Sequence, residues 1–161
     1  RNGLMKGTGA TTFAPYALLT RGQMVTILYR AAGEPEVIGA SPFSDVVQGS
    51  YYEKAVIWAA EQNITEGVSA TAFAPYADTT REQMVTFLYR FARLQGADVT
   101  ATGSLEHYSD AEQVSPWAVD AMIWAVEQGI VHGTAADILN PRGVARRIQA
   151  AKVMAVWDQK F

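Results

Sequence analysis

Residues 80–90 read Thr-Arg-Glu-Gln-Met-Val-Thr-Phe-Leu-Tyr-Arg, and the interpretation of the whole chain starts from this stretch. Sixty residues earlier, residues 20–30 read Thr-Arg-Gly-Gln-Met-Val-Thr-Ile-Leu-Tyr-Arg, which is nearly the same sequence. A weaker copy at 146–154 reads Arg-Arg-Ile-Gln-Ala-Ala-Lys-Val-Met. Self-similarity at a regular spacing predicts an architecture built from repeated structural units.

The second repeat carries the complete pattern. Phe-Ser-Asp-Val leads into an apolar segment, a turn, a Phe-Ala-Pro segment and the helix start, at 43–46, 52–62, 63–67, 73–75 and 80. The third repeat follows the same order, at 108–111, 117–128, 129–133, 139–141 and 146. The first repeat has only the later half, with its turn at 3–7, Phe-Ala-Pro at 13–15 and helix start at 20.

We therefore divide the chain into three units that together form one domain. Residues 1–32 are the second half of the first repeat, and residues 43–95 and 108–161 are the second and third repeats. The connectors at 33–42 and 96–106 are rich in Gly, Pro, Ser, Thr and Ala, which is typical of surface linkers.

The turns predict where the first helix of each repeat ends. Gly3, Asn63 and Gly129 take the same place, directly after an apolar or incomplete helical segment. Glycine and asparagine tolerate the left-handed conformation that ends many helices. Each is followed by Leu or Ile, which can pack back against the helix end. We expect helices at 52–62 and 117–128.

The helices that begin at Arg21, Arg81 and Arg147 should be largely buried, because their apolar residues cover a broader arc than the stripe of a surface helix. Strand signals are weak, since the Phe-x-Pro segments are too short to predict a sheet. The sequence therefore predicts a mainly α fold made of three helix-loop-helix repeats, the first of them incomplete.

The composition excludes several classes of protein. With 161 residues and 49% hydrophobic residues, the chain can form one globular domain. A net charge of −3 argues against a nucleic-acid partner, and the absence of cysteine excludes disulfides and thiolate chemistry. No apolar run approaches the roughly 20 residues of a membrane helix, so no membrane insertion is expected. The chain begins at Arg1 without a methionine, and we expect it to be a piece of a longer protein.

The ordered pattern of the second repeat resembles an S-layer homology repeat. The resemblance rests on Phe-Ser-Asp-Val at 43–46, the Trp-containing helix, Ile64-x-x-Gly67, Phe73-x-Pro75 and Thr-Arg-Glu-Gln at 80–83. It covers nearly the whole chain, and repeats of this family commonly occur in threes. It implies that the three repeats pack in a pseudo-threefold helical arrangement.

The resemblance also implies a function. The family anchors bacterial surface proteins non-covalently to secondary cell-wall polysaccharide, and the glycan lies in grooves between neighbouring repeats. This chain is therefore expected to be a secreted, non-catalytic carbohydrate-binding module of the bacterial cell wall or cell surface, without a cofactor. The motif arginine is implicated in binding an anionic group such as a pyruvyl ketal, which by matched position points to Arg21, Arg81 and Arg147. We expect Arg81, in the complete repeat, to be the strongest of the three.

The chain departs from the family pattern in three places. Gln23, Gln83 and Gln149 stand where the motif usually has Glu. Arg146 replaces the threonine in the third repeat, and the first repeat lacks its first helix. The three arginines are therefore not expected to form equal sites.

The threonines and glutamines of the motif have a structural alternative. Thr20 with Gln23, and Thr80 with Gln83, have the spacing of a capping box, in which each side chain satisfies a backbone N–H. This structural role is the main expectation for these four residues, which are also candidate glycan contacts.

The arginines are harder to explain by local structure. A cation at the first helical position opposes the helix macrodipole. Free N–H groups at a helix N-terminus bind anions, and a guanidinium beside them suits a carboxylate. The alternative is an intramolecular partner, such as Asp78 or an acidic residue of the next repeat.

Aromatic side chains are further candidates, because carbohydrate sites use aromatic faces. Tyr52 and Trp117 are candidate glycan contacts, although core packing is an open alternative for both. The other candidates are Tyr16, Tyr51, Tyr76 and Tyr108. Trp58 and Trp124 lie within apolar helical segments and should be core residues. Asp45 and Asp110 should cap or brace loops.

Catalytic signals are poor. His107 and His132 fall at different repeat positions and form no ligand-spaced cluster, so neither a metal site nor an enzyme is expected. The alternative function is a helical repeat module for protein–protein assembly at the cell surface. The helix that is missing from the first repeat would be supplied by residues outside this sequence or by another chain.

Overall fold

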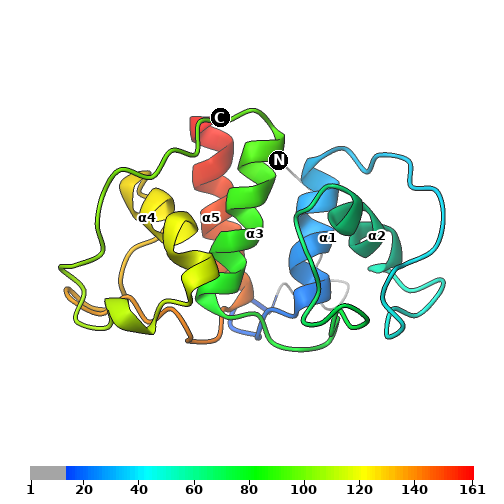
Figure 1. The fold of residues 1–161 in the computed structure, drawn as a ribbon, viewed down its shortest axis with the longest axis horizontal. Coiled ribbons are helices and arrows are strands. Elements are labelled where there is room, and N and C mark those ends of the chain that lie inside the picture. The colour runs from blue at the N-terminus through cyan, green and yellow to red at the C-terminus, as the bar shows by residue number, and fades with distance from the viewer. Residues whose placement is uncertain (1–13) are drawn as a thin grey trace.

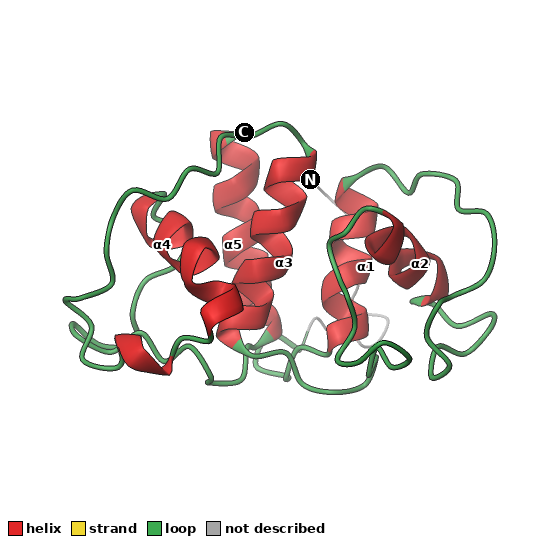
Figure 2. Cartoon of the chain, in the orientation of Figure 1, coloured by secondary structure: helices red, strands yellow, loops and turns green. Residues whose placement is uncertain are grey.

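The computed structural model describes residues 14–161, and in this part of the chain it contains five α-helices and two short 3-10 helices (Figures 1 and 2). The α-helices are α1 (Arg21–Ala31), α2 (Glu53–Glu61), α3 (Arg81–Leu94), α4 (Val119–Glu127) and α5 (Arg147–Lys160). The 3-10 helices are η1 (Ala111–Gln113) and η2 (Pro116–Ala118). Extended pairing within residues 14–161 is limited to isolated bridges, so the mainly α prediction is confirmed.

The predicted helix starts at 21, 81 and 147 are confirmed, and local capping explains two of them. The Gln23 N–H donates to Thr20 Oγ1 at 3.2 Å, and the Thr20 N–H donates to Gln23 Oε1 at 3.0 Å. Thr80 and Gln83 form the same capping box on α3. These bonds satisfy N–H groups that a helix start leaves without helical partners.

The first helices of the second and third repeats also end where the sequence predicts. Asn63 and Gly129 have φ angles of 57° and 66°, in the left-handed region that stops a helix. The Ile64 N–H then bonds back to Ala59 O at 2.8 Å. Gly3 lies outside the described residues.

Helices pair across repeat boundaries. α2 packs against α1, and α4 packs against α3, so the first helix of a repeat covers the second helix of the repeat before it (Figure 1). Equivalent aromatic pairs mark both contacts. Tyr29 and Trp58 have ring centroids 5.7 Å apart, and Tyr89 and Trp124 have centroids 5.6 Å apart. Each packed helix pair therefore combines the second helix of one sequence repeat with the first helix of the next.

A closed ring of backbone hydrogen bonds joins the three repeats. The Leu19 N–H donates to Ala145 O at 2.9 Å, Ala145 donates to Thr79 O at 2.7 Å, and Thr79 donates to Leu19 O at 2.8 Å. All three residues are completely buried and directly precede the N-caps of α1, α3 and α5. This cyclic pattern gives the molecule its pseudo-threefold arrangement.

Two aspartates brace the loops before α3 and α5. The carboxylate of Asp45 accepts from the N–H groups of Phe73 and Ala74, at 2.9 and 2.7 Å. Asp110 accepts in the same way from Leu139 and Asn140, at 2.8 and 2.7 Å. Ala74 has a φ of 58°, which is unfavourable for alanine, and the brace holds it there.

Candidate functional site

The N-terminal N–H groups of the three long helices are not free, which corrects one part of the anion-binding argument. In α1, the Arg21 and Gly22 N–H groups donate to Ala77 O and Pro75 O, both at 2.9 Å. The equivalent bonds in α3 run from Arg81 and Glu82 to Gly143 and Pro141, and those in α5 run from Arg147 and Ile148 to Ala17 and Pro15. A proline-containing loop of a neighbouring repeat, with Pro75, Pro141 or Pro15 as an acceptor, therefore takes the place that an anion would occupy.

Arg21 is buried between repeats. Its side chain is 4% exposed, its Nε donates to Phe73 O at 2.8 Å, and its guanidinium carbon lies 4.8 Å from the ring centre of Phe73. Burial lowers its pKa to about 10, with a smaller opposing effect from Asp45. Arg21 therefore remains a cation at neutral pH.

Arg81 and Arg147 occupy equivalent places. Arg81 is 7% exposed and donates from Nε to Leu139 O at 3.2 Å and from Nη2 to His132 O at 2.7 Å. Burial lowers the pKa of Arg81 and of Arg147, which is also buried. Arg21 and Arg81 thus use backbone carbonyls of the neighbouring repeat as partners, and Asp78 is not among them.

A pocket of about 370 Å³, which we call the α3 pocket, lies where the three repeats meet. Its lining residues come from α1, from the turn of the second repeat, from α3 and from η2: Arg21, Thr65, Glu66, Gly67, Val68, Gln83, Thr86, Phe87, Arg90 and Trp117. The charged residues of the lining are Arg21, Arg90 and Glu66, so the pocket carries a net positive charge. The pocket brings together three predicted site residues, Arg21, Gln83 and Trp117.

Arg90 and Thr86 were missed by the sequence argument. They lie at helical spacing from Gln83 and therefore share its face of α3. The Arg90 Nη1 donates to Ile64 O at 3.1 Å, and the Thr86 hydroxyl donates to Glu82 O at 2.7 Å. The available signal was their repetition, because Thr26 and Arg30 stand at the same positions of the first repeat.

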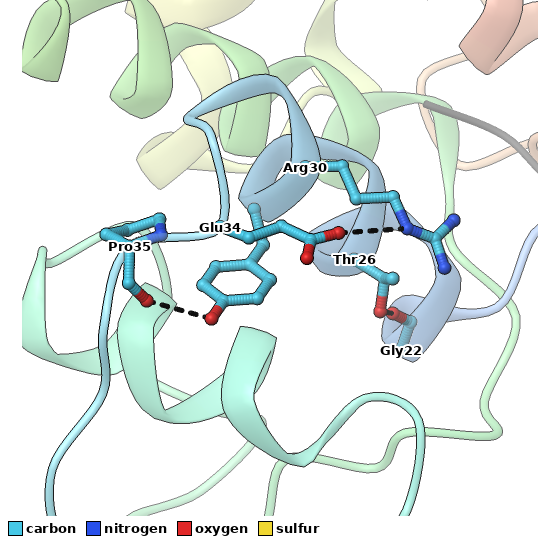
Figure 3. A network of polar contacts seen from close by, with 6 residues as sticks. Gly22, Thr26, Arg30, Glu34 and Pro35 are labelled. Atoms are coloured by element: carbon cyan, nitrogen blue, oxygen red, sulfur yellow. Dashed lines mark hydrogen bonds and ion pairs between the residues drawn. The ribbon is translucent and has the colours of Figure 1, made fainter. Parts of the chain in front are cut away.

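A second pocket, of about 250 Å³, repeats part of this arrangement on α1. It is lined in part by Thr26, Arg30 and Tyr51, the counterparts of Thr86, Arg90 and Trp117. Here Arg30 forms an ion pair with Glu34, with 3.8 Å between Nε and Oε1, as Figure 3 shows. The residue four positions after Arg90 is an apolar leucine. The α3 pocket is therefore the more favourable of the two for an anion.

The predicted aromatic candidates separate into two groups. Trp117 is 52% exposed at the edge of the α3 pocket, and Tyr16, Tyr51 and Tyr76 are also exposed. Tyr52 and Tyr108 are buried, so their rings have no open face for a sugar. Trp58 and Trp124 are core residues, as predicted.

The predicted cap residues lie at the N-termini of α1 and α3. Thr20, Gln23, Thr80 and Gln83 all take part in capping boxes, and Gln83 also lines the α3 pocket. No group of three metal-ligating side chains occurs within residues 14–161. None of the helices described is long and apolar enough to cross a membrane.

A profile of the S-layer homology domain matches residues 1–25, 42–85 and 107–151. The chain belongs to the S-layer homology domain family. It contains three segments of this family, the first of them truncated, as the resemblance predicted. The matched segments include the motif arginines of all three repeats, Arg21, Arg81 and Arg147, and the last segment ends within α5.

The relatives of this S-layer homology module are much larger proteins, and the module matches a small part of each. The surface-layer 125 kDa protein of Lysinibacillus sphaericus is 33% identical over 95% of this chain and 13% of its own length. An endoglucanase of Bacillus sp. (strain KSM-635) is 30% identical over 94% of this chain and 16% of its own length. The chain thus spans a small part of either relative, and the same module accompanies different proteins.

A solved structure shares the fold. The undecaheme cytochrome from the S-layer of Carboxydothermus ferrireducens superposes with a TM-score of 0.54 at 20% identity. The match covers 91% of this chain and 18% of the cytochrome. The S-layer homology fold is thus found in a further S-layer protein.

Proposed function

We propose that this S-layer homology module anchors the protein that contains it to the bacterial cell wall, by binding an anionic polysaccharide without catalysis or covalent attachment. The observation that carries the proposal is the α3 pocket, where the guanidinium groups of Arg21 and Arg90 and the exposed ring of Trp117 lie together between repeats. Its surface-layer relative supports a place at the cell surface.

The chemistry of the pocket suits an acidic sugar. A guanidinium binds carboxylate through paired, charge-assisted hydrogen bonds, and a pyruvyl ketal on a sugar offers such a carboxylate. The indole of Trp117 supplies a face for the apolar side of a sugar ring. Gln83 can donate and accept hydrogen bonds, whereas Thr86, whose proton is used by Glu82 O, can only accept.

The two arginines have different tasks in this proposal. Arg21 is almost fully buried and holds Phe73 O, so it contributes positive potential and shapes the wall of the pocket. Arg90 is half-buried and donates from Nη1 to Ile64 O, so the rest of its guanidinium makes the main contact with the anion. The remaining predicted site residues have a structural task in this proposal, because they are buried between repeats or cap a helix. They are Arg81, Arg147, Tyr52, Thr20, Gln23 and Thr80.

The test is co-sedimentation with cell-wall sacculi of Lysinibacillus sphaericus that retain their polysaccharide. Arg90→Ala should weaken binding by about tenfold or more, because a charge-assisted hydrogen bond contributes about 1.5–3 kcal/mol. Trp117→Ala should weaken it several-fold. Arg30→Ala, at the same position of the first repeat, is the matched control and should have a smaller effect.

Treatment of the sacculi separates the polysaccharide from other wall components. Mild acid, which hydrolyses pyruvyl ketals, should reduce binding of the wild-type protein, and complete removal of the polysaccharide should abolish it. Undiminished binding to stripped sacculi would contradict the proposal and favour a protein partner, the alternative function. Equal binding by wild type and Arg90→Ala would remove the α3 pocket from the mechanism.

A further inference from the structure

Glu82 is a buried carboxylate that ties α3 to the third repeat. It is 4% exposed and accepts two hydrogen bonds from Ser115, one from the backbone N–H at 2.9 Å and one from the hydroxyl at 2.7 Å. A buried carboxylate is costly unless it is fully hydrogen-bonded. The capping of α3 does not need it, since Thr80 and Gln83 form the capping box.

Ser115 is the residue from which the turn carrying Trp117 begins. It is the N-cap of η2, and its carbonyl accepts from the Ala118 N–H at 2.8 Å. Pro116 follows, and its ring fixes φ at the start of the turn. With Ser115 bonded to Glu82 through both its N–H and its hydroxyl, the start of the turn that carries Trp117 is tied to α3.

The second repeat supplies the same kind of bond from a different residue. Gly49 is the counterpart of Ser115, and its N–H donates to Glu53 Oε2 at 2.8 Å, within its own repeat. Val119 stands at the position of Glu53 in the third repeat and cannot accept a hydrogen bond. A carboxylate is therefore present at this N–H in both repeats, from α2 in one and from the neighbouring α3 in the other.

The residue equivalent to Glu82 in the first repeat explains why Gly49 is bonded by Glu53 of its own repeat and not by a residue of α1. In the first repeat this position is Gly22, where an added Cβ would lie 3.0 Å from Pro75 O and 3.4 Å from the side chain of Tyr52. The third repeat has the small Ala118 in place of Tyr52. Where the first contact has Gly22 and Tyr52, the second has Glu82 and Ala118, and the smaller Ala118 leaves room for the Glu82 side chain to reach Ser115.

We propose that Glu82 is a positioning residue for the pocket, which sets Trp117 at a fixed distance from the α3 face that carries Gln83 and Arg90. The inference rests on the proposed function, since it assigns Trp117 to the ligand site. Glu82 touches no ligand, and it acts through Ser115 and η2. One hydrogen-bonded bridge thereby connects two walls of the same pocket.

The first experiment needs no ligand. In protein labelled with 5-fluorotryptophan, the Trp117 signal is assigned by its disappearance in Trp117→Phe. Glu82→Ala should shift or broaden this signal while the signals of Trp58 and Trp157 stay in place. Glu53→Ala, which removes the equivalent bond to Gly49, should leave the Trp117 signal unchanged. An unchanged Trp117 signal in folded Glu82→Ala would overturn the positioning role.

The second experiment measures binding to the same polysaccharide-bearing sacculi. Glu82→Ala should bind several-fold more weakly than wild type, and by no more than Trp117→Ala does, because Glu82 acts on the ligand only through the position of Trp117. Glu82→Gln should recover most of the affinity, because its amide oxygen can accept from the Ser115 N–H and its amide N–H can donate to the hydroxyl. If Glu82→Ala does not fold, Ser115→Ala removes the hydroxyl contact and should weaken binding by a smaller factor.

The outcomes separate the two proposals. If wild type does not bind the sacculi, the proposed function fails, and the fluorine spectrum still decides whether Glu82 orders Trp117. If wild type binds and folded Glu82→Ala binds equally well, the positioning role fails and the proposed function stands.

Discussion

At the scale of single residues, the repeated arginine is chiefly a link between repeats. Arg21 and Arg81 donate to the carbonyls of Phe73 and Leu139, which stand at equivalent positions of the following repeat. An arginine at the first position of a helix is unfavourable for the macrodipole, but here its side chain reaches across to backbone acceptors. Arg21 and Arg81 therefore link neighbouring repeats, and Arg21 also lines the α3 pocket.

Asp110 offers a residue-scale test with a defined pH dependence. Burial raises the pKa of its carboxyl, but the N–H groups of Leu139 and Asn140 and the charge of Arg81 outweigh this, so the pKa lies below its ordinary value of 3.8. A carboxyl with a depressed pKa in the folded state stabilises the fold above its unfolded pKa, and this stabilisation is lost as the pH falls below it.

Asp110→Asn should therefore lower the free energy of unfolding at neutral pH by about 1–3 kcal/mol, because each carboxylate oxygen accepts from one N–H and the amide would place an NH2 donor opposite one of them. The difference from wild type should shrink as the pH falls below about 4. Urea unfolding across this pH range measures it, with the exposed Glu36→Gln as control. A difference that stays constant down to pH 2 would contradict the assignment.

At the scale of elements, the three long helices begin in the same register but with unequal caps. Thr20 and Thr80 accept a hydrogen bond at the start of α1 and α3. In α5 the N-cap is Arg146, whose side chain is a donor, although the Gln149 side chain still accepts from the Arg146 N–H at 2.7 Å. Half of the capping box is therefore retained in the third repeat.

Arg146→Thr should restore the missing half. The backbone of Arg146 is extended, with φ −107° and ψ 157°, which a threonine cap also adopts. The expected gain is up to about 1 kcal/mol in the free energy of unfolding. Arg146 also donates to Tyr16 O at 2.6 Å, so Arg146→Ala is needed as the reference that loses this bond without gaining a cap. Thr and Ala variants of equal stability would argue against the cap.

At the scale of the whole molecule, no repeat stands alone. The ring formed by Leu19, Thr79 and Ala145 closes only when all three repeats are in place, and each first helix packs on a helix of the repeat before it. Backbone bonds within a buried ring are costly to leave unpaired. The repeats should therefore unfold together.

Leu19→Ala tests this cooperativity. Truncation of this completely buried side chain should lower the free energy of unfolding by about 2–5 kcal/mol. Far-UV circular dichroism and tryptophan fluorescence should still report one coincident transition, because the tryptophans lie in the second and third repeats while the change is in the first. Separate transitions by the two probes would show that the repeats unfold independently.

The sequence by itself determined the five helices of residues 14–161, the starts of α1, α3 and α5, the ends of α2 and α4, and the number of repeats, whereas the expected helix at 117–128 begins as the 3-10 helix η2 and becomes α-helical only at Val119. These features depend on short-range chemistry: the Thr–Gln spacing of a capping box, the left-handed residues Asn63 and Gly129, and the apolar arcs of the helices. The same local patterns carried the family resemblance, which the family profile confirms.

The tertiary structure alone decided which groups meet. The loop of one repeat occupies the helix N-terminus of another, so the N–H groups that the sequence left open to an anion are already bonded. Arg90 and Trp117 come from different repeats, and Glu82 reaches Ser115 through the packing of α3 against η2. Contacts between residues tens of positions apart depend on how the repeats close around their common axis, and a local pattern contains no information about that closure.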